Sequence, residues 1–287
     1  GVFVMERLLD LAAKELGITP AEIRKRNLIP PEKFPYKNEI IYQDFTNLTY
    51  DSGNYMPSMD KALELIDYEK FLKEEQPKLR AEGKHVGIGV VSYVEGTGIG
   101  PYEGARVTVG SSGKVSVSTG VGTQGQGHFT SFAQVVADVL KVKIENIIVS
   151  TGDTSKMHWG TGTFASRGIV VAGNACHAAA VAVREKILKL AAENLGSSVE
   201  NIVLEDGKAY LKDNLDKKIS FGELAAKANP LRGAVKPGTE PGLEATSYFG
   251  PSSGATANGV HALILEVNLK TLKVEIKKYV VVHDCGK

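Results

Sequence analysis

Four glycines in eight positions mark residues 120–127, which read Gly-Val-Gly-Thr-Gln-Gly-Gln-Gly and precede His128. Glycine permits positive φ and removes the Cβ that would hold a ligand away from the backbone, although it costs conformational entropy. Gln124 and Gln126 each offer a neutral amide that donates and accepts hydrogen bonds. We therefore expect this loop to bind a polar ligand.

Residues 120–125 also satisfy the dinucleotide-binding pattern G-x-G-x-x-G, so a nicotinamide-dependent dehydrogenase is one alternative. In that fold the preceding strand is parallel and buried on both faces. Here residues 114–119 alternate polar and apolar and follow residues 105–109 across a short polar turn, as in an antiparallel hairpin. The acidic residue expected about 20 positions after the glycines is also missing. A hairpin over residues 105–119 would disfavour the dehydrogenase.

A second glycine-rich passage, residues 160–168, contains Ser166 and Arg167 and leads into small side chains at residues 172–180. A helix N-terminus favours an anion, and a guanidinium fork suits phosphate oxygens. The structural alternatives are that Arg167 pairs with a surface acid, that the alanines pack helices, and that Gln126 forms hydrogen bonds with its own loop. Two loops that each favour binding of an anion together suggest a long phosphorylated cofactor.

The composition is that of an ordinary globular protein, with 287 residues, 43% hydrophobic and 23% charged. The formal net charge of +1 gives no reason to expect a nucleic-acid partner. No apolar run is long enough to span a membrane and residues 1–7 do not resemble a secretory signal, so cytoplasm is the simplest compartment. Two isolated cysteines and scattered histidines predict neither a disulfide framework nor a metal site.

The helical period of residues 1–16 and the break at 17–20 predict a helix pair that ends near Asn27, with Thr19 as N-cap and Pro20 in the first turn. Further helices are expected over 58–80, 128–140, 172–195 and 220–228, and strands over 85–94, 105–119, 146–150, 202–205, 209–211, 260–268 and 274–282. Hairpins mixed with helices predict an α+β fold with a two-layer mixed sheet and a helical N-terminal segment. Because the chain starts within a helix, we expect a fragment of something longer.

These stretches together resemble the molybdopterin-binding large subunit of the molybdenum hydroxylases, the family of xanthine dehydrogenase, aldehyde oxidase and aerobic carbon monoxide dehydrogenase. The resemblance covers nearly the whole chain. The matching stretches are residues 4–10 and 22–28 (a signature helix pair), 92–98 (the carbon monoxide dehydrogenase-like branch), 125–128 (the cofactor-gripping G-Q-G loop), 163–168 (the segment that holds the dithiolene and pyrophosphate end) and 279–287.

The resemblance implies that residues 1–80 are the end of a first molybdopterin-binding lobe with a bridge, and that 81–287 are a second lobe, truncated at its C-terminus. It implies a molybdopterin cofactor, in the cytosine dinucleotide form, for water-dependent oxidation of a carbon centre or of carbon monoxide. It also implies a FAD-binding medium subunit and a 2Fe-2S small subunit as partners, in a dimer of heterotrimers. The implied cofactor contacts are Gly125, Gln126, Gly127, Ala165, Ser166, Arg167 and Gly168.

The chain departs from the family pattern at three places. Gly168 stands where the family usually carries serine or threonine, and Leu272 occupies a turn position usually held by glycine. The family's catalytic glutamate lies beyond the stretch that matches residues 284–286, so no catalytic residue is assigned and the chain alone is expected to be inactive. Glu223 follows Ser220 at a capped helix start and is interpreted as structural.

A non-catalytic scaffold module of a larger complex is the second alternative. Saturable binding of a pterin dinucleotide, weakened by Gln126→Ala or Arg167→Ala, would exclude a scaffold.

Overall fold

The computed structural model describes residues 1–42, 45–231, 235 and 238–286, and it divides into two compact units. Unit 1 consists of Gly1–Thr97 with Gly254–Lys287, and unit 2 consists of Gly98–Ser253. The units are not bounded at residue 80, because a strand near the C-terminus pairs with the strand that begins at His85. The assignment of residues 1–80 and 81–287 to two lobes of a larger subunit stays a prediction.

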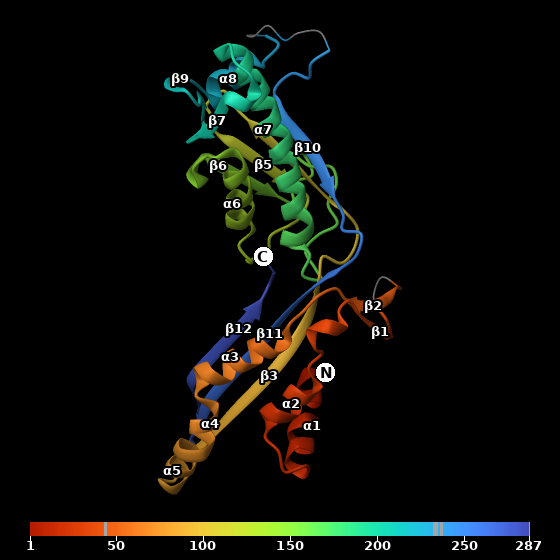
Figure 1. The fold of residues 1–287 in the computed structure, drawn as a ribbon, viewed down its shortest axis with the longest axis vertical. Helices are drawn as coiled ribbons and strands as arrows, with labels where there is room; N and C mark the ends of the chain where they lie inside the picture. The colour runs from red at the N-terminus through yellow and green to blue at the C-terminus, as the bar shows by residue number, and fades with distance from the viewer. Residues whose placement is uncertain (43–44, 232–234, 236–237, 287) are drawn as a thin grey trace. The chain divides into compact units, whose positions relative to one another are not determined.

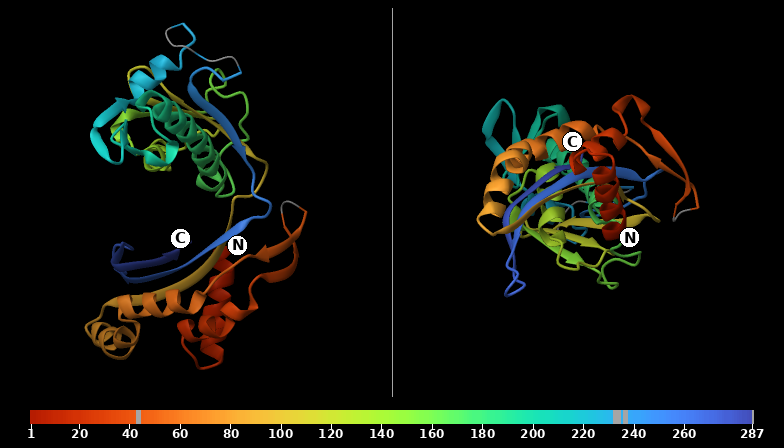
Figure 2. Two further views of the ribbon diagram at one scale, coloured as in Figure 1. Left: turned by 45° about the horizontal axis from the view of Figure 1, so that its top comes forward. Right: turned by 90° about the horizontal axis from the view of Figure 1, so that it is seen from below.

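Unit 1 is built on an antiparallel sheet in the order β12-β11-β3, beside a separate β1-β2 hairpin. Helix α3 packs along one face of that sheet, as Figure 2 shows. The core of unit 1 between them includes Met59, Ile66 and Val260. The elements are α1 (Val2–Glu15), α2 (Pro20–Asn27), a 3-10 turn (Pro31–Lys33), β1 (Tyr36–Ile41), β2 (Asn47–Tyr50), α3 (Tyr55–Ile66), α4 (Tyr68–Lys70), a π-helical turn (Phe71–Glu75), α5 (Gln76–Ala81), β3 (His85–Thr97), β11 (Ala255–Val267) and β12 (Val274–Asp284).

The predicted helix pair at the N-terminus is confirmed. The Thr19 hydroxyl accepts a hydrogen bond from the backbone N–H of Glu22 at 3.1 Å, and Pro20 occupies the first turn of α2. The buried guanidinium of Arg24 joins α2 to α1 through ion pairs with Glu6 at 2.5 Å and Asp10 at 3.0 Å. This ion-pair cluster, rather than a large apolar contact, links the two helices, since only Ala13 of α1 is buried.

Unit 2 is built on a mixed sheet in the order β10-β4-β5-β6, with a smaller antiparallel sheet β7-β8-β9 beside it (Figure 1). Its elements are β4 (Glu103–Val109), β5 (Val115–Thr119), α6 (His128–Leu140), a 3-10 turn (Ile144–Asn146), β6 (Ile147–Thr151), a π-helical turn (Gly168–Gly173), α7 (Asn174–Leu195), a 3-10 turn (Val199–Asn201), β7 (Ile202–Glu205), β8 (Lys208–Leu211), β9 (Asn214–Ser220), α8 (Phe221–Lys227) and β10 (Leu243–Phe249). The fold is therefore α+β, with a mixed sheet as predicted.

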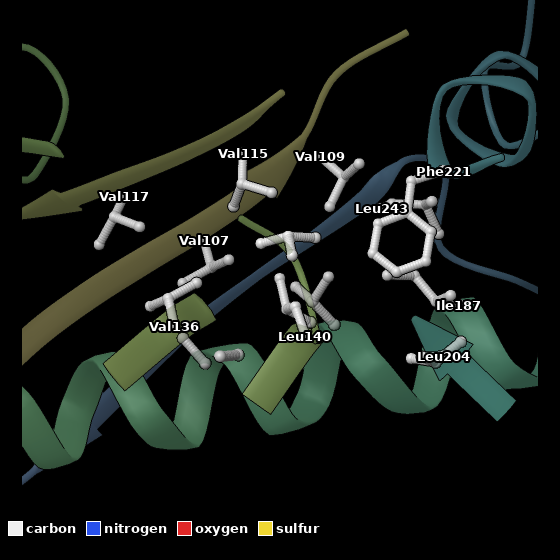
Figure 3. Packing of buried hydrophobic residues seen from close by; sticks show 14 of the residues in the cluster. Val107, Val109, Val115, Val117, Val136, Leu140, Ile187, Leu204, Phe221 and Leu243 are labelled. Atoms are coloured by element: carbon white, nitrogen blue, oxygen red, sulfur yellow. The ribbon is translucent and has the colours of Figure 1, made fainter. Parts of the chain in front are cut away.

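The core of unit 2 lies between the mixed sheet and the helices α6 and α7. Alternate residues of the hairpin, including Val107 and Val115, point into this core. Figure 3 shows Val107 beside Val136 of α6, and Ile187 of α7 farther along the cluster. Burying each such side chain contributes about 1.5–3 kcal/mol. The opposite face of the hairpin carries exposed side chains such as Arg106. No helix in the described parts of the chain is long and apolar enough to cross a membrane.

The hairpin predicted over residues 105–119 is confirmed, because β4 and β5 pair antiparallel from Ala105↔Thr119 to Val109↔Val115. On its other side β5 pairs with β6 in parallel, so the glycine loop and α6 form a β-α-β connection within the mixed sheet. A doubly wound dinucleotide fold surrounds its first strand with parallel neighbours. The antiparallel β4 beside β5 does not fit that arrangement.

Candidate functional site

The glycine loop after β5, residues 120–127, is called loop A. Gly125 has φ +104° and Gly127 has φ +84°, a region that side-chain-bearing residues rarely adopt. The side-chain oxygen of Gln126 accepts hydrogen bonds from the backbone N–H of Gln124 at 2.6 Å and from the hydroxyl of Thr123 at 3.3 Å. The internal role considered for Gln126 is therefore present, while the residue itself stays exposed.

The second loop, residues 160–168, is called loop B, and it contains two consecutive non-glycine residues with positive φ. Ala165 has φ +47° and Ser166 has φ +49°. Each such residue costs on the order of 1–3 kcal/mol and persists only where the surroundings impose it, which is common in ligand-binding segments. Both residues belong to the set predicted to contact a cofactor.

Loops A and B lie against each other. A Cβ on Gly120 would stand 2.0 Å from the carbonyl oxygen of Trp159, and a Cβ on Gly160 would stand 2.5 Å from the carbonyl oxygen of Gly120. The side-chain amide of Gln124 donates to the carbonyl of Thr163 at 3.4 Å, and the Thr163 hydroxyl donates to the carbonyl of Gly122. Backbone therefore packs on backbone, and the two predicted binding stretches converge in unit 2.

Two helical segments begin where the loops meet. Helix α6 follows Gly127, and the π-helical turn that leads into α7 follows Arg167, and neither start has a side-chain hydrogen-bond cap. A Cβ on Gly168 would stand 2.5 Å from Nε2 of His128, the first residue of α6, so the two starts are adjacent. Uncapped N-terminal N–H groups with the positive end of the helix dipole form an environment that favours an anion.

The imidazole of His128 separates these two helix starts. His128 is 4% exposed, and its ring stacks on Phe132 with centroids 4.7 Å apart. Burial lowers the pKa of His128 below its usual value of 6.5, so the ring is neutral at pH 7. The ring excludes any side chain larger than hydrogen at position 168 without adding a charge. This contact gives a physical reason for a glycine at position 168.

The side chain of Arg167 is fully buried. Its Nε donates to the carbonyl of Ile99 at 3.0 Å, and Nη1 donates to the carbonyl of Gly162 at 2.7 Å and to the carboxylate of Glu103. Nη2 donates to the carbonyl of Pro101. The guanidinium thus has partners inside the protein, and a contact between Arg167 and a cofactor stays a prediction.

Glu103 is the residue of this site that the sequence analysis missed. Its side chain is fully buried, and its Oε1 accepts hydrogen bonds from the backbone N–H groups of Thr161 at 3.0 Å and Gly162 at 3.1 Å. A usable signal was its position in the alternating strand, in phase with the buried Ala105 and Val107. A carboxylate at a strand position that faces the core requires a cation or hydrogen-bond donors. Arg167 is its cationic partner.

Glu223, interpreted from the sequence as structural, forms a capping box at the start of α8. The Ser220 hydroxyl accepts from the backbone N–H of Glu223 at 3.2 Å, and the Glu223 carboxylate accepts from the backbone N–H of Ser220 at 2.8 Å. The hydrogen bonds from the Ser220 side chain and backbone lower the pKa of Glu223. The structural interpretation is confirmed by this geometry.

The Ser220→Ala substitution should lower the free energy of unfolding by about 1 kcal/mol, because the first turn of α8 loses its cap. A carboxyl group with a depressed pKa contributes stability above its unfolded pKa of about 4.3 and loses it as the pH falls through the folded value. The difference between wild type and variant should therefore shrink below about pH 4. Urea denaturation at pH 7 and pH 3.5 measures both effects, and equal stability at pH 7 would contradict the capping role.

Comparison with known proteins shows the family. A family model described as a molybdopterin cofactor-binding domain matches residues 61–287. The nicotine 6-hydroxylase large subunit of Paenarthrobacter nicotinovorans is 35% identical over 100% of this chain and 35% of its own length. The carbon monoxide dehydrogenase large chain of Hydrogenophaga pseudoflava is 31% identical over 99% of this chain and 36% of its own. The crystal structure of quinoline 2-oxidoreductase from Pseudomonas putida 86 matches with a TM-score of 0.82 and 35% identity, covering 98% of this chain and 36% of that one.

The chain thus spans about a third of the length of the curated relatives that it matches. The family model covers loops A and B and most of the chain, and the relatives are large subunits or large chains of oxidoreductases, in agreement with the resemblance found in the sequence. This chain belongs to the molybdopterin cofactor-binding domain family.

Proposed function

We propose that loops A and B hold the phosphate-bearing end of a molybdopterin cofactor. The observation that carries the proposal is the meeting of the two loops at two adjacent, uncapped helix starts, beside the strained Ala165 and Ser166. Such a place offers backbone N–H groups, and loops A and B, which the structure describes in full, contain no acidic residue, while the charge of the neighbouring Glu103 is paired with Arg167. These donors fit phosphate oxygens better than they fit a metal ion.

The residues of this chain would bind and orient the cofactor, whereas its molybdenum, when bound, supplies the redox chemistry. Glycines at 125 and 127 let the backbone approach closely, and the exposed amide of Gln126 offers donors beyond its internal bonds. Ala165 and Ser166 adopt left-handed backbone conformations in loop B, and Gly168 lets the neutral ring of His128 pack against the start of the helical turn.

For the whole protein we propose a molybdenum hydroxylase large subunit that oxidises a carbon centre or carbon monoxide with water as the oxygen source. The cofactor would be the cytosine dinucleotide form. A FAD-binding medium subunit and a 2Fe-2S small subunit would be its partners in a dimer of heterotrimers in the cytoplasm. The relatives' names, which include a nicotine hydroxylase and a carbon monoxide dehydrogenase, support the reaction class. The catalytic base would lie outside this chain, which alone would be inactive.

The test is elemental and pterin analysis of the full polypeptide that contains this chain, purified with its natural neighbours. The proposal expects molybdenum and a phosphate-bearing pterin in near-stoichiometric amounts. A polypeptide with neither component would remove the proposal and favour the scaffold alternative.

The Gln126→Ala substitution should reduce pterin retention by up to about tenfold, because each hydrogen bond that shapes the loop contributes about 0.5–1.5 kcal/mol. The backbone N–H of Gln124 and the hydroxyl of Thr123 lose their common acceptor, so loop A no longer keeps its shape. Pterin content after gel filtration measures the effect. Gln134→Ala, at an exposed glutamine of α6 outside the loop, is the matched control and should retain the cofactor. Equal retention in both variants would count against loop A as the binding element.

A further inference from the structure

The conformation of loop B is not one that its own sequence prefers. Ala165 and Ser166 both have φ close to +50°, and neither is glycine. Two such residues together cost on the order of 2–6 kcal/mol. Something outside the pair must therefore hold the loop in this shape.

The groups that hold it converge on Arg167, the next residue. Its guanidinium reaches the carbonyls of Ile99 and Pro101, which belong to the segment before β4, and the carbonyl of Gly162 at the other end of loop B. The backbone N–H of Gly98 donates to the carbonyl of Ser166 at 3.3 Å. Loop B is thus fastened to the segment that enters β4 by contacts at its end.

The beginning of loop B is fastened by Glu103 on β4. One carboxylate oxygen, Oε1, accepts from the N–H groups of Thr161 and Gly162 and from the guanidinium of Arg167. The other oxygen, Oε2, is buried and has no hydrogen-bond partner within the described part of the chain. Among the described residues, every hydrogen bond of the carboxylate is therefore made to loop B.

A buried ion pair is a poor source of stability, because desolvation offsets its Coulombic attraction and apolar replacements are often as stable. The Glu103–Arg167 pair is fully buried on both sides. Its specific effect is geometric, since it fixes the start and the end of one short loop from a single strand position. The strained residues lie between these two fixed points.

We propose that Glu103 is a positioning residue for the cofactor site: with Arg167 it holds loop B in the strained, ligand-accepting conformation before the ligand binds. The identity of the ligand in this inference rests on the proposed function. The ordering of loop B by Glu103 and Arg167 does not depend on it. Neither residue needs to touch the cofactor. Binding is then stronger because the ordering of loop B is complete in the free protein.

The experiment uses the full polypeptide and replaces both charges with apolar groups, in the double variant Glu103→Leu/Arg167→Met. The fold should survive, because neither charge is left unpaired. The N–H groups of Thr161 and Gly162 lose their acceptor, so pterin retention should fall about tenfold or more. Hydrogen exchange at these two amides should accelerate about tenfold while the α7 amides keep their protection.

A conservative variant separates geometry from charge. Glu103→Gln keeps a carbonyl oxygen for the N–H groups of Thr161 and Gly162, so retention per folded molecule should stay within about threefold of wild type. If Glu103→Gln loses as much pterin as the double variant, the positioning role is wrong. Full retention and unchanged exchange in the double variant would also overturn it.

The matched control is Arg24→Met in unit 1, where another buried arginine loses its ion pairs with Glu6 and Asp10. It should lower stability without changing pterin retention or exchange at Thr161 and Gly162. The exchange measurement needs no cofactor. A wild-type protein without pterin but with protected Thr161 and Gly162 amides would therefore contradict the proposed function and leave the positioning role supported.

Discussion

Gly120→Ala should cost at least about 3 kcal/mol of unfolding free energy, at the upper end of typical overpacking penalties. The added methyl would stand 2.0 Å from the carbonyl oxygen of Trp159 and 2.4 Å from the Cα of Gly160. Both neighbours are backbone atoms, so no side-chain rotation relieves the clash. Loops A and B would have to separate, and pterin retention should be lost together with stability.

The control for this prediction lies two residues away in the same loop. A Cβ on Gly122 would have no heavy atom within 4 Å, so Gly122→Ala should leave the free energy of unfolding within about 0.5 kcal/mol of wild type. Urea denaturation of both variants at one protein concentration provides the comparison. Equal stabilities would show that the loops are not packed backbone to backbone.

Local signals in the sequence were sufficient for most helices and for the hairpin. The N-cap at Thr19, the proline at position 20 and the alternating valines of residues 105–117 each act on neighbouring residues, and the structure has the corresponding elements. The turn at Leu272 has φ +59°, a backbone conformation that glycine adopts more readily than leucine.

Non-local pairing was harder to predict. Strand β10 (Leu243–Phe249) was missed, although it lies directly beside β4, from which it is separated by more than a hundred residues. The pairing of β3 with β11 likewise decides where unit 1 ends, and no short pattern encodes it. The β1-β2 hairpin was hidden in a stretch of weak periodicity.

Burial could not be inferred from these local patterns. The apolar stripe of α1 gave the correct helix, but Val4, Leu8 and Leu11 are more than half exposed in this chain. The contact expected between Arg167 of loop B and the cofactor stays a prediction, but no local pattern indicated that the Arg167 side chain is fully buried. A long cationic side chain in a loop looks solvated until its partner is known, and that partner, Glu103, lies 64 positions earlier.

Arg167→Met should lower the free energy of unfolding by about 3–5 kcal/mol, because it leaves the buried carboxylate of Glu103 without its cation. The carbonyls of Ile99, Pro101 and Gly162 lose their donors in the same step. Urea denaturation measures the loss, and a change below about 1 kcal/mol would contradict the buried arrangement.

Arg167→Lys distinguishes this internal role from a phosphate contact, because a lysine ammonium binds phosphate well as a point charge but cannot reproduce the guanidinium fork. If Arg167 acted mainly on the cofactor, the lysine variant would keep its stability and much of its pterin. Since the guanidinium instead serves four acceptors on Ile99, Pro101, Glu103 and Gly162, we expect the lysine variant to lose about 2–4 kcal/mol of stability. Thermal unfolding of the pterin-free protein measures this loss of stability directly, because no bound ligand contributes to the stability.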